Sequence, residues 1–308
     1  MLKNKAIVMA INKRIPVILD TDIGGDIDDT WALAMMLNSP ELDVRMVLAD
    51  HGDTVYRARL LGRMLETAGR TDVDVGVGIR QPMAARLKMQ AEWAKGYRLS
   101  RYPGRVHLDG VGAMIDMIMK SKESVILICI GPMPNIAAAL DREPAIAKKA
   151  RFVGMHGSIA WSHDKDHKPI AEYNVSADIS ACQKVFNAPW DKTITPLDTC
   201  GKVALSGAKY RAVAKSEYVL PKMVMENYRI WKKQGGWIGT DNRSSILFDC
   251  VAVYLAFSDR FLKMKRMGIR VTDDGFTVPD PKGPKVNCAL GWKDLDAFED
   301  LLVERLTA

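Results

Sequence analysis

The stretch "VILDTDIGGDIDDTWALAMML", residues 17–37, crowds five acids between two apolar runs. The apolar run before the acids has the pattern of a buried strand, and the run after them has the pattern of a helix. Ionised carboxylates this close repel one another, so either some are protonated or a cation neutralises them. A dense set of oxygen ligands suits calcium or magnesium rather than zinc. The five acids are Asp20, Asp22, Asp26, Asp28 and Asp29.

Three simpler explanations of the acidic stretch fit less well. Asp28 or Asp29 could cap the following helix, but a cap uses one acid and not five. An EF-hand loop needs flanking helices, glycine in sixth place and glutamate in twelfth place; here a strand precedes, Gly24 stands fifth and Trp31 twelfth. A phosphatase of the haloacid dehalogenase type also has D-x-D after its first strand, but this chain has no clear later acidic pair on a loop.

Strand patterns and helix patterns alternate along the chain up to about residue 188. This alternation indicates parallel βαβ units, so we predict an α/β fold with a doubly wound, mostly parallel sheet and flanking helices. We predict a single domain, 1–308, in which about 205–265 forms a mainly helical cap. Strands are expected at 15–20, 44–50, 73–78, 124–131 and 151–157, and helices at 30–38, 55–69, 110–122, 135–150, 176–188, 217–236 and 244–258, before a mixed end with a last helix.

Four loops follow the predicted strands directly. In an open α/β sheet, ligands bind beyond the carboxyl ends of the strands. We therefore expect these separate pieces of chain to converge on one crevice that contains the acidic loop. The four loops are Asp20–Asp29, Asp50–Thr54, Ile130–Asn135 and Met155–Ser158.

The acidic stretch resembles the D-x-D-x-G-x-D-D-A-x-A-L signature of the nucleoside hydrolases, the calcium-dependent N-ribohydrolases of the inosine–uridine-preferring type. Further segments resemble other motifs of this family, and they occur in the family's order from about residue 15 to the end. The resemblance implies the fold of that family and its reaction. These segments are "DHGDT" (50–54), "ICIGPMPNIAAAL" (128–140), "FVGMHG" (152–157), "AEYNVSADISACQKVF" (171–186) and "LFDCVAVYLA" (247–256).

The resemblance implies a calcium ion bound by Asp22, Asp29, Asp249 and the backbone carbonyl of Ile130, with Asp20 close by. The implied reaction is hydrolysis of the N-glycosidic bond of a ribonucleoside to free base and ribose. A calcium-bound water would attack the anomeric carbon, with Asp22 as the general base. The transition state would resemble an oxocarbenium ion, which carboxylates already in place stabilise.

Sugar-binding residues are also implied by the resemblance. Asp28 would hold the 2′-hydroxyl, and Asn174 and Glu172 would hold the 3′- and 5′-hydroxyls. The implied role is nucleoside catabolism or purine salvage. Further substrate-binding positions are Asp53, where the family has a loop asparagine, and Met155, His156 and Asp249.

Several departures from the family pattern concern the base end of the site. Gly25 and Asp26 are inserted in the acidic loop, and the family's H-G-x-x-G segment is missing. Phe248 stands where many members have a histidine that protonates the leaving base. The histidines that could take over that role are His156, His163 and His167, and the aromatic residues that could stack on a base or pack in the core are Tyr228, Trp231 and Trp237.

Two alternatives to a standard nucleoside hydrolase remain open. The same fold and calcium site could act on a modified ribosyl substrate, because the base pocket departs from the family at Phe248. A catalytically silent calcium- and ribose-binding protein is the other alternative, although such a protein has no chemical need for Asp22. In either case the partner is a small ribosyl compound, and the resemblance implies a homo-oligomer, either a dimer or a tetramer.

The composition excludes several other partners. The net charge is +7, but the basic residues are scattered, whereas a nucleic-acid interface clusters them. No stretch has the length of a membrane span, so we expect neither nucleic acid nor membrane as a partner. Five widely spaced cysteines without a C-x-x-C pair indicate reduced, buried thiols and the cytoplasm. The apolar stretch 6–11 is too short for a good signal peptide, but export with a removed signal peptide is not excluded.

Overall fold

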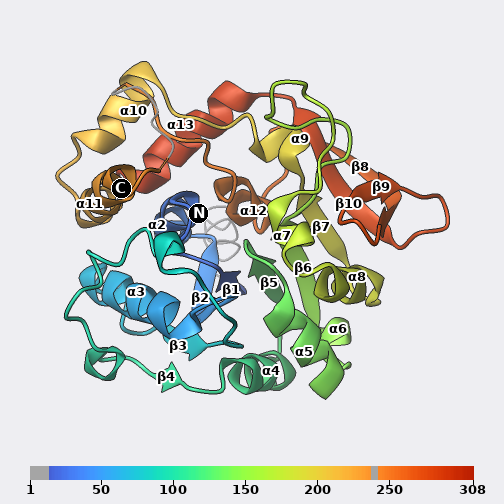
Figure 1. Cartoon of the computed structure of the whole chain (residues 1–308), viewed down its shortest axis with the longest axis horizontal. Coiled ribbons are helices and arrows are strands. Elements are labelled where there is room, and N and C mark those ends of the chain that lie inside the picture. Colours follow the sequence, from blue (N-terminus) through green and yellow to red (C-terminus); the bar gives the residue numbers. More distant parts are fainter. Residues whose placement is uncertain (1–13, 237–241) are drawn as a thin grey trace, which may run out of the picture.

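A ten-stranded sheet forms the centre of the computed structural model, which describes residues 14–236 and 242–308 (Figure 1). The strand order is β4-β3-β2-β1-β5-β6-β7-β10-β8-β9. All neighbouring strands from β4 to β10 pair in parallel, and β8 and β9 are antiparallel to their neighbours. The predicted mostly parallel α/β sheet is confirmed. The strands are β1 (Ile15–Thr21), β2 (Leu42–Ala49), β3 (Asp74–Val77), β4 (Val106–His107), β5 (Val125–Cys129), β6 (Ala150–Met155), β7 (Lys192–Thr195), β8 (Leu262–Val271), β9 (Thr277–Pro279) and β10 (Lys285–Trp292).

The strand order reverses at β1. From β1 the chain builds outward through β2 and β3 to β4, and it then returns to the other side of β1 and builds β5, β6 and β7. Such a switch point leaves a crevice at the carboxyl ends of the two central strands, because their connections leave in opposite directions. Asp20 pairs with Cys129 in the register of β1 and β5, so the acidic loop begins at this crevice.

Helices cover both faces of the sheet (Figure 1). Val17 and Leu19 of β1 pack into a core with α2, α3, α11, α12 and α13, whereas Ile18 packs into a second core with α4, α5 and α8. This alternation follows from the two-residue period of a strand. The helices are α2 (Asp28–Leu37), α3 (Thr54–Thr67), α4 (Gly110–Lys120), α5 (Pro134–Arg142), α6 (Ile146–Lys149), α7 (Tyr173–Ser176), α8 (Ile179–Asn187), α9 (Leu197–Cys200), α10 (Gly207–Ala214), α11 (Val219–Lys233), α12 (Cys250–Leu255) and α13 (Leu295–Leu306), with 3₁₀ turns at Ala85–Leu87 and Leu99–Arg101.

Two predicted helices are wrong in their extent. The helix expected at 135–150 is divided into α5 and α6, because Pro144 disfavours helical backbone at Glu143. The helix expected at 244–258 begins only at Cys250. The segment just before α12 is not helical. In it, the hydroxyl oxygen of Ser244 accepts a hydrogen bond from the backbone N–H of Leu205. The short strands β4 and β7 were not predicted.

The cysteines agree with the expectation of buried thiols, because all five are free and buried. No helix in the described ranges is both long enough and apolar enough to cross a membrane. The apolar stretch 6–11 and Trp237 lie outside the described residues.

Candidate active site

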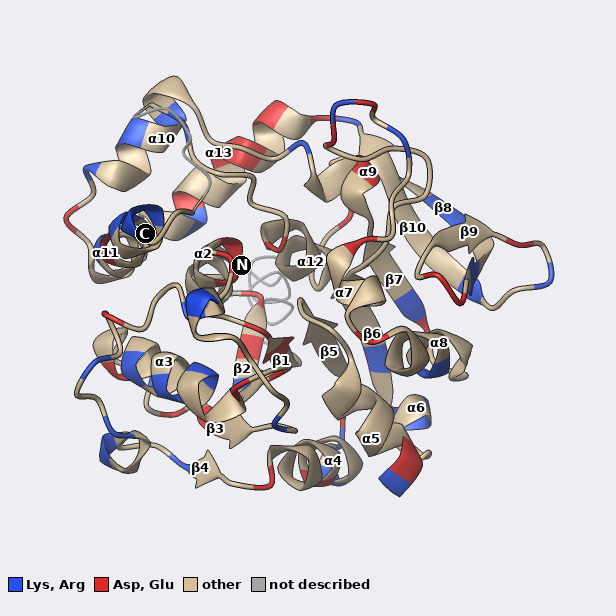
Figure 2. Ribbon diagram, in the orientation of Figure 1, with Lys and Arg blue, Asp and Glu red and all other residues tan. Residues whose placement is uncertain are grey.

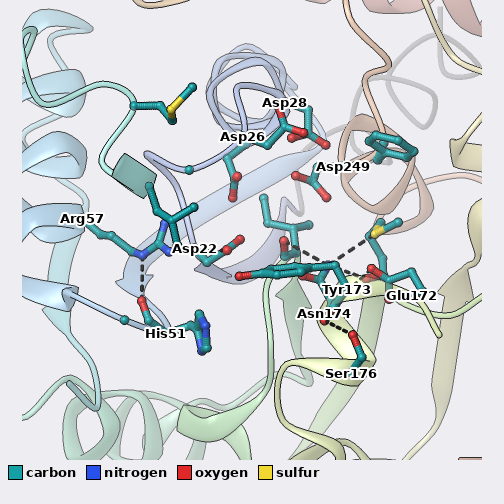
Figure 3. Close-up of a pocket in the computed structure, with 18 of the residues that line it drawn as sticks. Asp22, Asp26, Asp28, His51, Arg57, Glu172, Tyr173, Asn174, Ser176 and Asp249 are labelled. Carbon is teal, nitrogen blue, oxygen red and sulfur yellow. Dashed lines mark hydrogen bonds and ion pairs between the residues drawn. The ribbon is translucent and has the colours of Figure 1, made fainter. Parts of the chain in front are cut away.

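A cavity of about 710 Å³ opens at the switch point of the sheet (Figure 3). Each of the four loops that were expected to converge contributes to its lining, through Asp22, His51, Ile130 and Met155. This volume lies within the range of small-molecule sites. Figure 2 shows acidic segments at the end of β1 and the start of α2, near the middle of the molecule, while basic segments spread over the outer helices.

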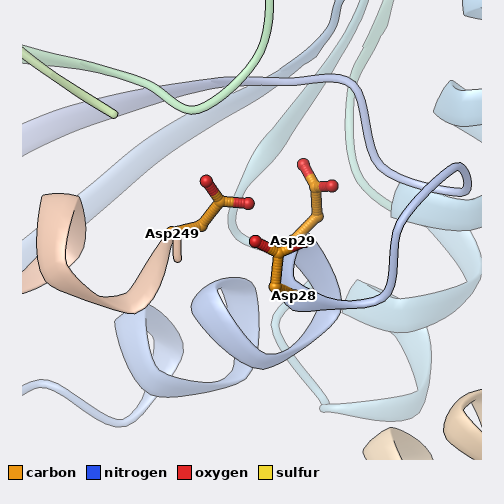
Figure 4. A group of neighbouring side chains, drawn as sticks. All are labelled: Asp28, Asp29 and Asp249. Carbon is orange, nitrogen blue, oxygen red and sulfur yellow. The ribbon is translucent and has the colours of Figure 1, made fainter. Parts of the chain in front are cut away.

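Three buried aspartates meet at one side of this cavity (Figure 4). Asp28 and Asp29 lie in the first turn of α2, and Asp249 directly precedes α12, so the chain's two ends supply the group. Each contributes a carboxylate oxygen, and these oxygens lie within 4.8 Å of one another. Burial, followed by the repulsion of neighbouring carboxylates, raises the pKa of all three aspartates well above the usual range.

The chemistry of this group fits a hard divalent cation. Its donors are carboxylate oxygens, which calcium prefers. A shared cation would relieve the repulsion that raises their pKa values. Asp22 and Ile130 line the same cavity, although Asp22 stands outside the group of three. The residues present therefore fit the calcium ion that the resemblance implies.

Asp22 and Asp20 have different environments although they stand two residues apart. Asp22 lines the cavity, its side chain is 14% exposed, and one carboxylate oxygen lies 3.5 Å from the Arg57 guanidinium. Asp20 is fully buried and accepts a hydrogen bond of 2.9 Å from Nδ2 of Asn135. Burial raises the pKa of Asp20 to about 7. Asp22 thus faces the cavity, and Asp20 lies in the core beside Asn135.

Two predicted sugar-binding residues, Glu172 and Asn174, line the cavity from the start of α7. Asn174 donates from Nδ2 to the carbonyl of Met155 at 3.0 Å, and this nitrogen lies 3.5 Å from the Ile130 carbonyl. Glu172 accepts hydrogen bonds from the backbone N–H groups of Asn174 and Gly157. Burial raises the pKa of Glu172 to about 7. The structure therefore brings Asn174 beside the Ile130 carbonyl, while Glu172 accepts hydrogen bonds from nearby backbone N–H groups.

Asp53 and His156 are not part of the described lining of the large cavity. Asp53 caps α3 by accepting from the N–H of Tyr56, and it pairs with Lys88 at 2.5 Å in a second, smaller cavity. His156 is fully buried and makes a 3.0 Å hydrogen bond to the carbonyl of Gly131, and burial lowers its pKa to about 3. Both side chains make these other contacts. A substrate contact for either residue stays a prediction.

The rest of the cavity lining includes several apolar and aromatic side chains. Phe248 and Trp231 line the cavity together with His163 from the loop after β6. The rings of His163 and Phe248 meet edge to face, with centroids 5.2 Å apart. His167 stacks instead on Trp161. Tyr228 is buried against Trp31 in the core.

Arg57 and His51 also line the cavity and were not identified from the sequence. Arg57 lies in α3 and is 2% exposed. His51 lies in the quoted segment "DHGDT" (50–54), of which only Asp53 was assigned a role, and Arg57 lies in no quoted motif. The available signal was their position, in and just after a loop that was expected to reach the crevice.

Comparisons with known proteins identify the family of this chain. The family described as inosine-uridine preferring nucleoside hydrolase matches residues 17–300. The pyrimidine-specific ribonucleoside hydrolase RihA of Enterobacter sp. (strain 638) is 28% identical over 323 residues, which cover 95% of this chain and 97% of that protein.

Solved structures of nucleoside hydrolases share the fold. A plant nucleoside hydrolase, the PpNRh1 enzyme, has a TM-score of 0.80 at 22% identity, covering 96% of this chain and 100% of that one. The inosine-uridine preferring nucleoside hydrolase of Bacillus anthracis has a TM-score of 0.78 at 18% identity, covering 95% and 99%. The chain belongs to the inosine-uridine preferring nucleoside hydrolase family, and it is a hydrolase that acts on the N-glycosyl bond of ribonucleosides.

Proposed function

We propose that this enzyme binds its ribonucleoside with the ribose beside Asp28, Asp29 and Asp249, and that it requires calcium. The observation that carries the proposal is the convergence of three buried carboxylates from the two ends of the chain at one cavity. Buried carboxylates that crowd together are costly to maintain. Their presence in a small-molecule cavity is explained when they bind a cation and a polyhydroxylated sugar.

The residues that would hold calcium are Asp22, Asp29, Asp249 and the carbonyl of Ile130, with Asp20 behind them. When bound, calcium would polarise a water and fix sugar hydroxyls, because it accepts about six to eight oxygen ligands. Asp28, Asn174 and Glu172 would hold the 2′-, 3′- and 5′-hydroxyls, respectively.

Asp22 is the proposed general base. Its carboxylate faces the cavity, and it would accept the proton of the attacking water as that water approaches the anomeric carbon. The positive charge that develops on the ribose ring would be stabilised by the carboxylates that already surround it. Proton transfer and charge stabilisation need carboxylates in different surroundings. Asp22 is partly exposed to the cavity, whereas Asp28 and Asp249 are buried.

His163 is the proposed donor of a proton to the leaving base. Of the three candidate histidines, it is the one in the described cavity lining, beside Phe248. Its Nε2 lies 4.0 Å from a carboxylate oxygen of Asp164. The side chain is 36% exposed, so solvent can return the proton after each turnover.

A ribose-release assay with and without a calcium chelator tests the function. The panel should contain uridine, cytidine, inosine and a 5′-substituted ribonucleoside. Chelator-sensitive release from a standard nucleoside supports the proposal, whereas release from the substituted compound alone indicates a modified ribosyl substrate. Binding of calcium and ribose without any release would indicate a silent binding protein. The homo-oligomer, the cytoplasmic location and a role in purine salvage stay predictions from the sequence.

A further inference from the structure

The side chain of Arg57 connects two of the loops that form the cavity. Its Nη1 donates to the carbonyl of Ile23 at 2.7 Å, in the acidic loop, and its Nε donates to the carbonyl of His51 at 2.7 Å, in the loop after β2 (Figure 3). Its Nη2 lies 3.5 Å from Oδ2 of Asp22. One buried guanidinium thus contacts two loops and a carboxylate.

The residue before Arg57 binds the same loop. The hydroxyl of Tyr56 donates to the carbonyl of Gly24 at 3.1 Å. Gly24 has a φ of +101°, and a Cβ there would lie 2.8 Å from the Tyr56 ring and 2.6 Å from Leu60. The first turn of α3 therefore holds consecutive carbonyls of the acidic loop, directly before the inserted Gly25–Asp26 pair.

The loop after β2 also adopts an unusual backbone at its contact with Arg57. His51 has a φ of +51°, in the left-handed region that residues other than glycine rarely adopt. Such a conformation costs energy and persists when the surroundings hold it. The hydrogen bond from Arg57 to the His51 carbonyl is one such restraint.

We propose that Arg57 is a positioning residue for Asp22, which deepens the proposed function and rests on Asp22 as general base. The guanidinium holds Oδ2 of Asp22, so the other oxygen stays available to the attacking water. It also fixes the two loops relative to each other. Lysine could supply the charge and three N–H donors, but all from one nitrogen on a flexible chain. It therefore cannot reproduce the three separate nitrogens with which the planar guanidinium of Arg57 reaches its partners.

The variants Arg57→Met and Arg57→Lys test this proposal, with Arg59→Met as the matched control. Arg59 lies on the same helix and also donates two hydrogen bonds to backbone carbonyls, those of Tyr97 and Ala94. We expect kcat of Arg57→Met to fall about 100-fold, since a misplacement of about 1 Å can cost that much. The kcat of Arg57→Lys should fall less. The KM of both Arg57 variants should change within about threefold, and Arg59→Met should keep the wild-type kcat.

Hydrogen–deuterium exchange provides a readout that does not depend on turnover. Arg57→Met should increase exchange in peptides covering 20–29 and 50–54, whereas Arg59→Met should leave both unchanged. The proposal is overturned when Arg57→Met keeps kcat within twofold, when Arg59→Met loses as much kcat, or when exchange at both loops is unchanged. A wild-type enzyme that releases no ribose with calcium would instead refute the proposed function, and the exchange measurement would still decide the positioning role.

Discussion

Two groups of side chains that line the cavity, here called its acidic side and its aromatic side, have opposite chemistry. One side presents the buried acids Asp28, Asp29 and Asp249, beside Asp22 at the end of β1. The other side presents Phe248, Trp231 and His163, from a turn, a helix and a surface loop outside the sheet. Asp22 directly follows β1, and Asp28 and Asp29 begin α2. Asp249 and the aromatic side come from later segments of the chain.

This difference indicates a division of labour between the two sides. The acids lie directly after β1 and at the starts of α2 and α12, and these elements pack into the core, so the acids can keep the geometry that bond cleavage needs. Loop and cap segments have fewer such restraints and can vary without loss of the fold. We therefore expect large effects on turnover from the acidic side and smaller ones from the aromatic side.

Calcium removal should have the largest effect, because it acts on the whole acidic side. A chelator should reduce ribose release below detection and lower the unfolding temperature, since the buried carboxylates then repel one another. Saturation at about 100 times Kd would stabilise the fold by about 2.7 kcal/mol. Thermal unfolding and ribose release, with calcium added back as the control, measure both. Equal activity with and without chelator would refute the calcium site.

Asp22→Ala tests the acidic side at a single residue. Loss of a general base lowers kcat by about 10²–10⁴-fold. Without calcium, the unfolding temperature should stay close to that of the wild type, because the Asp22 side chain is partly exposed and not part of the core. The increase on adding calcium should be smaller than in the wild type, because Asp22 is a proposed calcium ligand. Ribose release under saturating substrate, with circular dichroism to verify folding, provides the measurement. Retained turnover would exclude Asp22 as the base.

The pH dependence of folding stability tests the burial of His156 in the core. Its folded pKa of about 3 lies below the ordinary value of 6.5, so the unfolded chain binds the extra proton between these values. Its contribution to stability is complete above about pH 6.5 and should decrease as the pH falls, by about 3 kcal/mol at pH 4. Denaturant unfolding of the wild type and of His156→Gln from pH 4 to 8 gives the difference. Parallel pH profiles for the two proteins would contradict this assignment.

His163→Gln tests the aromatic side. Loss of the proposed leaving-group acid should lower kcat on uridine or inosine by about 100-fold, at the low end of general acid catalysis. Release of ribose from p-nitrophenyl riboside should stay near wild type, because that leaving group needs no proton. His167→Gln, on the same loop, is the matched control. Equal losses on both substrates would exclude a role in protonation.

Asp53→Ala should have the smallest effect. It tests whether Asp53 binds substrate, as the sequence predicts, or caps α3, as the structure shows. The structure uses Asp53 to cap α3, so its loss should cost about 1 kcal/mol of stability. KM and kcat should change little, because Asp53 lines a different cavity. Denaturant unfolding and steady-state kinetics measure both quantities. A large rise in KM with unchanged stability would restore Asp53 as a substrate-binding residue.

Much of the fold was predictable because its signals are local. Apolar runs such as 15–20 mark buried strands, and their alternation with helices implies a parallel sheet. The errors arose where a single residue or a distant contact overrides the pattern. Pro144 divides one predicted helix, and Ser244 and its neighbours delay the start of α12.

The sequence by itself determined the family, the α/β sheet and the acids that could form a cation site, because motif order and hydrophobic period depend on neighbours along the chain. Tertiary structure alone decided which groups meet. It brought Asp249 to Asp28 across the switch point, placed Arg57 against Asp22, and turned Asp53 and His156 to other partners. These outcomes depend on the direction of side chains from separate elements, which no local pattern encodes. Tertiary structure also decides the conformation around the inserted Gly25–Asp26 pair. Its loop is held by hydrogen bonds from α3, a helix that begins almost thirty residues later.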